Sequence, residues 1–403
     1  MTGYRDLLKK NPTYVGYGVL HYLFSSFGQT YLISLFVPKF IETLGINNTR
    51  FALIYSGATL TAAIFLPYLG SLVDKIRIRY ISVANGLMLV LFCWIVSHTP
   101  NQIILFLGIV GLRLGGQGMM IIIGSTAISR YFTENRGKAL SLSALGLPIG
   151  ETILPPLLIL LMHQVGWEFT WIIISLIILT VFIPSAIGLV RRDDNFQKPR
   201  RDDGINKRNT EYTRLQILKD PVFYIIMPTI LFIPFFLTGI FIHQNLLGEM
   251  KGWSLEWLGA CIAGYGTAKL ITNLLGGPII DKYTARKTFS FQLIPVGIGI
   301  LVLFHFTHPI AYLIFLFTAG ITTSFGSLTN AAIWAEMYGP RHLGTIKSIV
   351  TTLVIFSTAL GAIIIEKLYL SDLSFQIGLI FLLSTILLNG VITYIILVLR
   401  LRS

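Results

Sequence analysis

Three ionisable side chains interrupt long apolar stretches of this sequence: Arg113, Glu151 and Lys269. A guanidinium can hold a carboxylate through two parallel hydrogen bonds, and a lysine ammonium offers a point charge. A glutamate in apolar surroundings is suited to binding and releasing a proton, because burial disfavours its charged form. These residue types therefore predict a site that binds an anion and exchanges protons.

The stretches around these residues are long enough to cross a membrane. Hydrophobic residues make up 54% of the 403 residues and charged residues 12%, and the mean hydropathy is +0.74. A helix needs about 20 apolar residues to cross the bilayer core. We expect twelve such helices, over residues 14–38, 51–73, 79–97, 102–125, 138–162, 169–190, 221–245, 255–280, 287–306, 309–332, 344–368 and 375–399. The sequence thus predicts an all-α membrane protein.

The three ionisable residues lie deep in their predicted helices. At about 1.5 Å per residue, each is roughly 17–21 Å from the start of its helix. A charge at that depth costs at least about 2.5 kcal/mol, so such residues are functional candidates. Alternatively, Arg113 and Glu151, on consecutive antiparallel helices, form a static ion pair.

An internal repeat divides the chain. Gly70, Asp74 and a basic cluster end the second predicted helix, and Gly277, Asp281 and a second basic cluster end the eighth, 207 residues later. Residues 191–220 carry many charges and few apolar side chains, as expected of a linker. We therefore expect two pseudo-symmetric six-helix bundles, 1–190 and 221–403, joined by a cytoplasmic linker, 191–220.

The repeated loops resemble the signature loop of the major facilitator superfamily, which has Gly-x-x-x-Asp followed by Lys or Arg. The element Arg113-Leu-Gly-Gly-Gln-Gly118 is similar to the family's Arg-x-x-Gln-Gly, with one extra residue before Gln117. Gly146-Leu-Pro148-Ile-Gly150 is loosely similar to the proline-glycine motif of its antiporters. The resemblance implies a transporter in which two bundles rock about a central site, and a monomer.

In such a transporter the repeated loops are expected to latch the cytoplasmic side. A carboxylate there can accept hydrogen bonds from the start of a facing helix and pair with a cation. We expect Asp74 to meet the start of the eleventh helix and Asp281 that of the fifth. The alternative is that the loops only orient the protein. The candidate gate residues are Gly70, Asp74, Lys75, Arg79, Arg136, Gly277, Asp281, Lys282, Arg286 and Arg341.

Polar residues at helical spacing extend the predicted site. Those of the first helix are His21, Ser25 and Gln29, those of the eighth Tyr265, Lys269 and Asn273, and those of the tenth Ser324, Ser327 and Asn330. The predicted substrate-binding residues are Arg113, Lys269, Gln29, Tyr265, Asn273, Asn330 and Gln117, and the proton-coupling residues are Glu151 and His21. Hydrogen bonding between helices is an alternative role for each polar residue, and His21 is also suited to a structural role.

The charge asymmetry favours a ligand-specific role for the buried cations. At the 205-residue offset of a second repeat, Arg113 corresponds to Thr318 and Lys269 to Ile64, so the scaffold is duplicated and the charge is not. With Glu151 the three groups sum to +1. We interpret the chain as a secondary transporter of a small organic anion of the carboxylate type, coupled to protons. The alternatives are a proton-driven exporter of amphiphilic compounds and, less favoured, a sensor that transports nothing.

The basic residues predict the orientation. If both termini lie on one side, 25 of the 31 lysines and arginines lie on that side, so we expect cytoplasmic termini. The same distribution accounts for the net charge of +13 without nucleic acid. No phosphate-binding loop, metal-ligand set or nucleophile with a base is recognisable, so we expect no enzyme, cofactor or metal. Short loops indicate a multi-pass protein of a bacterial inner membrane.

Overall fold

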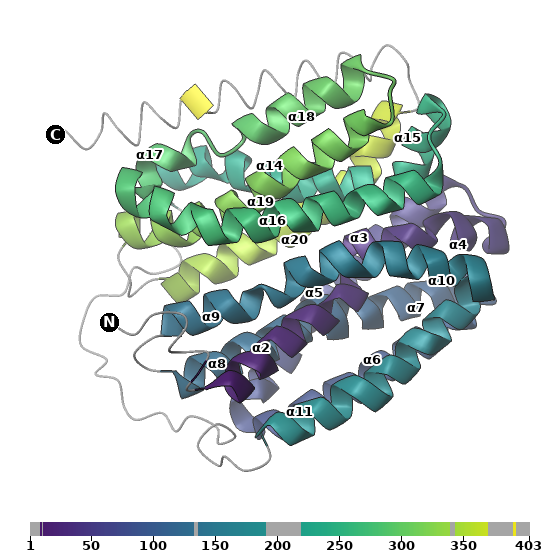
Figure 1. The fold of residues 1–403 in the computed structure, drawn as a ribbon, viewed down its shortest axis with the longest axis horizontal. Coiled ribbons are helices and arrows are strands. Elements are labelled where there is room, and N and C mark those ends of the chain that lie inside the picture. The colour runs from purple at the N-terminus through teal and green to yellow at the C-terminus, as the bar shows by residue number, and fades with distance from the viewer. Residues whose placement is uncertain are drawn as a thin grey trace. The chain divides into compact units, whose positions relative to one another are not determined.

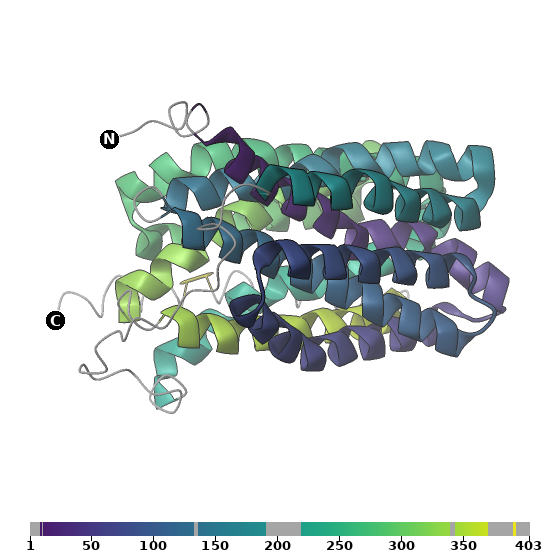
Figure 2. The same cartoon turned by 90° about the horizontal axis from the view of Figure 1, so that it is seen from below.

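The computed structural model describes residues 9, 11–132, 136–190, 219–338, 343–369 and 390–391. The chain divides into two compact units, Met1–Asp203 and Gly204–Ser403. In the described residues both units are helical and contain no strand. In Figures 1 and 2 the helices of each unit run side by side as a bundle.

The first unit contains short and long helices. They are α2 (Pro12–Phe24), η1 (Ser25–Gly28), α3 (Thr30–Ile33), η2 (Ser34–Phe36), α4 (Val37–Leu44), α5 (Asn48–Lys75), α6 (Ile78–Ser97), α7 (Gln102–Leu112), η3 (Arg113–Met120), α8 (Ile121–Tyr131), α9 (Arg136–Ala144), α10 (Gly146–Ile177), η4 (Ile178–Phe182) and α11 (Ile183–Val190). Consecutive pieces such as α7, η3 and α8 follow one another without a loop and form one predicted membrane helix.

The second unit has fewer interruptions. Its described helices are α14 (Pro221–Ile242), α15 (Gln244–Lys251), α16 (Leu255–Tyr283), α17 (Ala285–Phe289), α18 (Ile294–His305), α19 (Ile310–Tyr338) and α20 (Leu343–Tyr369). The twelfth predicted helix, 375–399, lies outside the described residues except for Gly390 and Val391.

Polar side chains begin several of the long helices. Asn47 Oδ1 accepts from Arg50 N at 2.8 Å at the start of α5, and Asn101 Oδ1 accepts from Ile103 N and Ile104 N, both at 3.0 Å, at the start of α7. Each cap satisfies N–H groups that have no partner within the helix. The helix boundaries therefore lie where polar residues meet the apolar runs.

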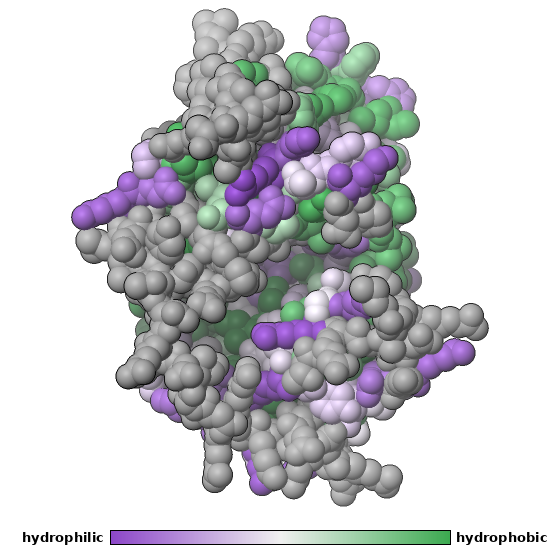
Figure 3. All heavy atoms as spheres, turned by 90° about the vertical axis from the view of Figure 1, so that its left-hand side faces the viewer, coloured by the Kyte–Doolittle hydropathy of each residue, from purple (hydrophilic) through white to green (hydrophobic). Residues whose placement is uncertain are grey.

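Large apolar side chains cover the outside of the helices. Ile64 is 75% exposed, Ile103 71% and Leu274 65%. In the described ranges eight helical stretches are long and apolar enough to cross a membrane, among them Asn48–Lys75, Ile78–Ser97 and Pro221–Ile242. Figure 3 views one end of the helices, where hydrophilic side chains gather, while hydrophobic ones run along the right-hand edge of the view. Lipid is the solvent that suits such apolar side chains.

Four predicted helices are interrupted in the described residues, the fifth at Leu145 and the seventh at His243. The first, expected over 14–38, is interrupted at Gln29, whose backbone is extended (φ −82°, ψ 150°). The ninth, expected over 287–306, is divided into α17 and α18 by residues 290–293. The expectation of one continuous first helix was wrong, because the hydrophobicity of a segment does not report where its backbone hydrogen bonds are interrupted.

Candidate functional site

Arg113 joins two irregular backbone segments of the first unit. It begins η3, a π-helical turn, and its Nη1 donates to Gly28 O at 3.3 Å and to Thr30 Oγ1 at 3.2 Å. Gly28 and Thr30 flank the break of the first helix at Gln29. The break leaves backbone groups without helical partners, and the guanidinium supplies a donor to one of them. Arg113 thus fastens the broken helix to η3.

Glycine makes this contact possible. A Cβ added to Gly28 would lie 2.1 Å from Leu112 O and 2.4 Å from Gln117 N, and one added to Gly116 would lie 2.5 Å from Gly28 N. The two backbones therefore touch where neither residue has a side chain. Within the π-helical turn the carbonyl oxygen of Gly115 also accepts a hydrogen bond from a side chain, Asn85 Nδ2, at 3.1 Å.

The side chain of Arg113 is buried, with 3% exposure. Its guanidinium carbon lies 5.3 Å from the centre of the Tyr55 ring, within the range of a cation–π contact. Its Nε has no hydrogen-bond partner among the described residues. Ion pairs of the first unit include Lys39–Glu42 and Arg130–Asp74. A static pair of Arg113 with Glu151 stays a prediction.

Glu151 lies beside the same break. It is in α10 and is 3% exposed. A Cβ on the preceding Gly150 would lie 2.2 Å from Ser26 Oγ of η1, so α10 runs close along the irregular part of the first helix. The first unit therefore gathers Arg113, Glu151 and the break at Gln29 in one region of its interior.

Lys269 occupies the corresponding depth of α16 in the second unit. It is 8% exposed, and its Nζ lies 5.0 Å from the centre of the Tyr265 ring, one turn earlier on the same helix. Ser324 Oγ of α19 donates to the carbonyl oxygen of Lys269 at 3.2 Å. Tyr265 and Lys269 therefore share a face, as their spacing predicted. Asn273, one turn further, is half-buried.

The remaining predicted binding residues fall into two settings. Gln29 is half-buried at the break itself, and Gln117 is half-buried within η3. Asn330 is half-buried in α19, where its Oδ1 has no hydrogen-bond partner among the described residues. Asn330 lines a cavity of the second unit with Ser327, and this cavity is described below.

His21 lies in a fully buried polar network between α2 and α6. Its Nδ1 lies 2.9 Å from Tyr17 O and its Nε2 lies 3.1 Å from Ser82 Oγ. The Tyr17 hydroxyl also hydrogen-bonds to Ser82. His21 and Tyr17 are 0% exposed, so this network has the partners expected of a structural histidine.

Each signature loop forms an ion pair with a neighbouring helix of its own unit, and the sequence did not predict either pair. Asp74 Oδ1 lies 2.9 Å from Nη2 of Arg130, which also donates to Val73 O at 2.7 Å. In the second unit Glu336 Oε1 accepts from Ala285 N at 3.0 Å. Arg286 Nη2 donates to Glu336 O at 2.7 Å, and its Nε lies 3.7 Å from Glu336 Oε2.

A sequence signal for these pairs existed. Arg130 and Glu336 both lie in the segments that repeat at the 205-residue offset, 127–137 and 332–342. Both side chains lie just past the predicted ends of the fourth and tenth helices, residues 125 and 332, and within α8 and α19 as observed. Only contact across the unit identifies them as partners.

The other candidate gate residues are placed in part. Gly70 is half-buried in α5; Lys75 and Arg136 are exposed. Arg79 and Lys282 each lie 5.1 Å from the ring centre of the tyrosine that follows them. Gly277 lies within α16, whereas Arg341 and the side chain of Asp281 lie outside what the structure describes.

Comparison with known proteins defines the class. The model of the Major Facilitator Superfamily matches residues 19–263 and 246–403. The chain therefore belongs to the major facilitator superfamily.

Several relatives carry only general names. The uncharacterized MFS-type transporter YcxA of Bacillus subtilis (strain 168) is 23% identical over 57% of this chain and 55% of its own length. YhjX of Escherichia coli (strain K12), also an uncharacterized MFS-type transporter, is 22% identical over 67% of this chain and 65% of its own. The matched part of this chain therefore spans between half and two thirds of these two relatives.

The fold has counterparts among solved structures. A bacterial homolog to the human lysosomal transporter Spinster, in an inward-facing and unoccupied conformation, matches with a TM-score of 0.67 at 14% identity. The match covers 99% of this chain and 96% of that one. The all-α fold of this superfamily is thereby confirmed.

The π-helical turn gives a physical account of the extra residue in the Arg-x-x-Gln-Gly element. A π-helical turn holds one residue more than an α-helical turn. The extra residue before Gln117 lies inside η3, Arg113–Met120. The helix thus accommodates the insertion by a local widening, while α7 and α8 on either side remain regular.

Proposed function

We propose that this protein moves a small organic anion of the carboxylate type across the membrane and couples the movement to protons. Two buried cations carry the proposal: Arg113 over the ring of Tyr55 and Lys269 over that of Tyr265. A tyrosine face attracts a cation without neutralising its charge. The buried Nε of Arg113, which lacks a partner among the described residues, is a donor for an anion.

Glu151 is the proposed proton carrier. It lies in the same interior region of the first unit as Arg113, on a helix that packs against the broken first helix. In the proposed cycle the protonation of Glu151 and the binding of the anion are linked through Arg113, since a charged carboxylate nearby competes with the substrate for the same guanidinium. His21 remains a second, less direct candidate.

The decisive experiment is transport into proteoliposomes under an imposed pH gradient. We expect accumulation of one or more small carboxylates and no movement of lipophilic cations. Lys269→Gln should lower the uptake at least about tenfold, which corresponds to about 1.4 kcal/mol of lost interaction. Lys39→Gln, at an exposed lysine paired with Glu42, is the matched control and should leave uptake unchanged. Movement of cations but not of anions would overturn the proposal in favour of an exporter.

The proton coupling has a separate test. Glu151→Gln should abolish accumulation driven by the pH gradient and spare the exchange of labelled for unlabelled anion, because exchange needs no net proton movement. If accumulation by Glu151→Gln keeps its proton dependence, Glu151 is not the carrier.

We further propose that the signature loops form a latch on the cytoplasmic side. The same proposal places both termini in the cytoplasm and the protein, as a monomer, in a bacterial inner membrane, with six-helix bundles over residues 1–190 and 221–403. Asp74, bound to Arg130, is 77% exposed at its side chain and thus remains accessible to a further partner. Asp74→Asn should insert normally and transport more slowly. Undiminished transport would remove the latch role.

A further inference from the structure

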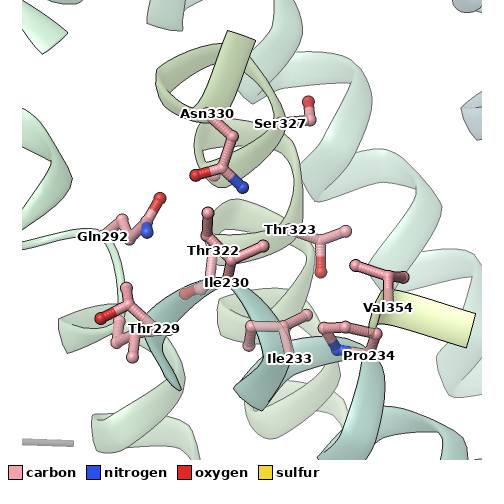
Figure 4. Close-up of a pocket in the computed structure, with 12 residues that line it drawn as sticks. Thr229, Ile230, Ile233, Pro234, Gln292, Thr322, Thr323, Ser327, Asn330 and Val354 are labelled. Atoms are coloured by element: carbon pink, nitrogen blue, oxygen red, sulfur yellow. The ribbon is translucent and has the colours of Figure 1, made fainter. Parts of the chain in front are cut away.

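The second unit contains a cavity that the ionic residues do not explain. It has a volume of about 190 Å³ and lies among α14, α19, α20 and the break between α17 and α18. Figure 4 shows Gln292 and Asn330 extending toward one another, with Thr229 and Thr322 nearby. None of the twelve residues that line it carries a charge.

The lining offers both acceptors and donors of hydrogen bonds. Thr323 and Ser327 donate their hydroxyl hydrogens to Ala319 O and Ser324 O, each at 2.8 Å, so lone pairs remain on both oxygens. Thr322 Oγ1 accepts from Val296 N at 3.0 Å. Its own hydroxyl hydrogen, like the amide N–H groups of Gln292 and Asn330, is a donor, so the walls present both acceptors and donors without a charge.

Two further acceptors lack ordinary partners. The Oδ1 atom of Asn330 is buried and has no hydrogen-bond partner among the described residues. Pro234 has no N–H with which to bond the carbonyl of Ile230 four residues earlier, and both residues line the cavity. A buried acceptor without a donor costs about 1–3 kcal/mol, so a bound donor is favourable here.

The chemistry of the ligand follows from these groups. The lining holds no cation to pair with an anion and no carboxylate to pair with a cation, so a charged ligand would lose its hydration without compensation. The volume of about 190 Å³ is below that of a drug-sized site, which is about 300–1,000 Å³. A small uncharged molecule that both donates and accepts hydrogen bonds fits these conditions.

We propose that this cavity binds a small uncharged polyol. The lining belongs to the second unit and includes none of Arg113, Glu151 and Lys269; of the predicted substrate-binding residues it includes Asn330. Because the test follows an uncharged ligand at a cysteine in the cavity, its result does not depend on whether an anion is transported.

A labelling experiment on the purified full chain tests the site. Ser327 lines the cavity and is exposed, whereas the native Cys93 and Cys261 are 0% and 2% exposed, so Ser327→Cys provides the accessible thiol. Erythritol at about twice its Kd should slow labelling of Ser327→Cys by a neutral methanethiosulfonate about threefold. Sucrose at equal osmolarity, too large for the cavity, should give no protection.

Variants assign the protection to the cavity. Asn330→Leu or the milder Asn330→Ser, each in the Ser327→Cys background, should abolish it. Thr267→Val should keep it, because the Thr267 hydroxyl bonds its own helix at Ala263 O and does not line the cavity. Size-exclusion chromatography and circular dichroism check that each variant is folded.

Four results would overturn the proposal. The first is an unreactive Ser327→Cys, because the cavity would then be closed to water-borne reagents. The others are no protection by erythritol, protection by sucrose equal to that by erythritol, and protection by Na⁺ instead of the polyol. Protection that survives both Asn330 variants would place the polyol elsewhere and would equally overturn the assignment.

Discussion

Arg113 Nη1 lies 3.3 Å from the carbonyl oxygen of Gly28, 85 residues earlier in the chain. With Thr30 Oγ1 at 3.2 Å, this places one guanidinium at the break of the first helix. We expect Arg113→Leu to lower the free energy of unfolding by about 1.5–3 kcal/mol for each charge-assisted hydrogen bond lost. Arg113→Lys should lose about half as much, since it keeps the charge and loses the fork. Thermal unfolding in detergent measures both.

A control separates this role from the binding of substrate. Thr30→Val removes one acceptor and no charge, so it should lower stability by about 1 kcal/mol and leave the affinity for the anion nearly unchanged. Equal stability of Arg113→Leu and the parent protein would contradict the structural role of the guanidinium.

The contact between Gly28 and Gly116 predicts sensitivity to a single methyl group. Gly28→Ala would place Cβ 2.1 Å from Leu112 O, a backbone atom that cannot move aside alone. We expect a loss of about 1–3 kcal/mol, as for overpacked interiors. Gly16→Ala, in α2 with nothing within 4 Å of the added Cβ, is the control. It should be neutral or stabilise by up to about 1 kcal/mol, because alanine favours a helix over glycine. Similar unfolding temperatures for the two variants would refute the close contact.

Glu336 caps the start of α17. Its carboxylate accepts from Ala285 N at 3.0 Å and Arg286 N at 3.3 Å, where the helix has free N–H groups. Glu336→Gln should therefore cost about 1 kcal/mol of stability, a typical loss for a helix cap. Glu42→Gln, in an exposed pair with Lys39, should cost less than about 0.5 kcal/mol. The cap would be disproved if the two losses, compared by chemical denaturation, were the same.

Thr284 holds a backbone conformation that suits glycine. Its φ is 67° and its ψ is 151°, a region that residues with a Cβ rarely adopt. The strain costs about 1–3 kcal/mol, and the greater chain entropy of glycine offsets about 1 kcal/mol. Thr284→Gly should therefore raise the unfolding temperature, whereas Thr284→Ala, which keeps the Cβ, should not. A gain with alanine as large as that with glycine would show that strain is not the cause.

The two signature loops contribute side chains of opposite charge to their ion pairs. In the first unit the loop supplies the carboxylate, Asp74, and the fourth helix supplies the cation, Arg130. In the second unit the loop supplies Arg286 and the tenth helix supplies Glu336. The sequence repeat predicted that the loops are equivalent. It did not predict these pairs, because they join residues 50 and 56 positions apart.

Much of the site could be placed from the sequence because its signals are local. The depth of Arg113, Glu151 and Lys269 follows from residue counts along apolar runs. The shared face of Tyr265 and Lys269 follows from the four-residue spacing of a helix. The break at Gln29 had no such signal, since the residues around it remain as apolar as those of a continuous helix.

The sequence by itself indicated a twofold-repeated all-α membrane protein, because transfer of side chains into lipid depends on composition and length alone. Only the tertiary structure decided where the helices break, that Arg113 donates to Gly28 O, and that a neutral cavity lies beside Asn330. These features depend on which backbones approach closely, and such an approach is set by packing between segments far apart in the chain.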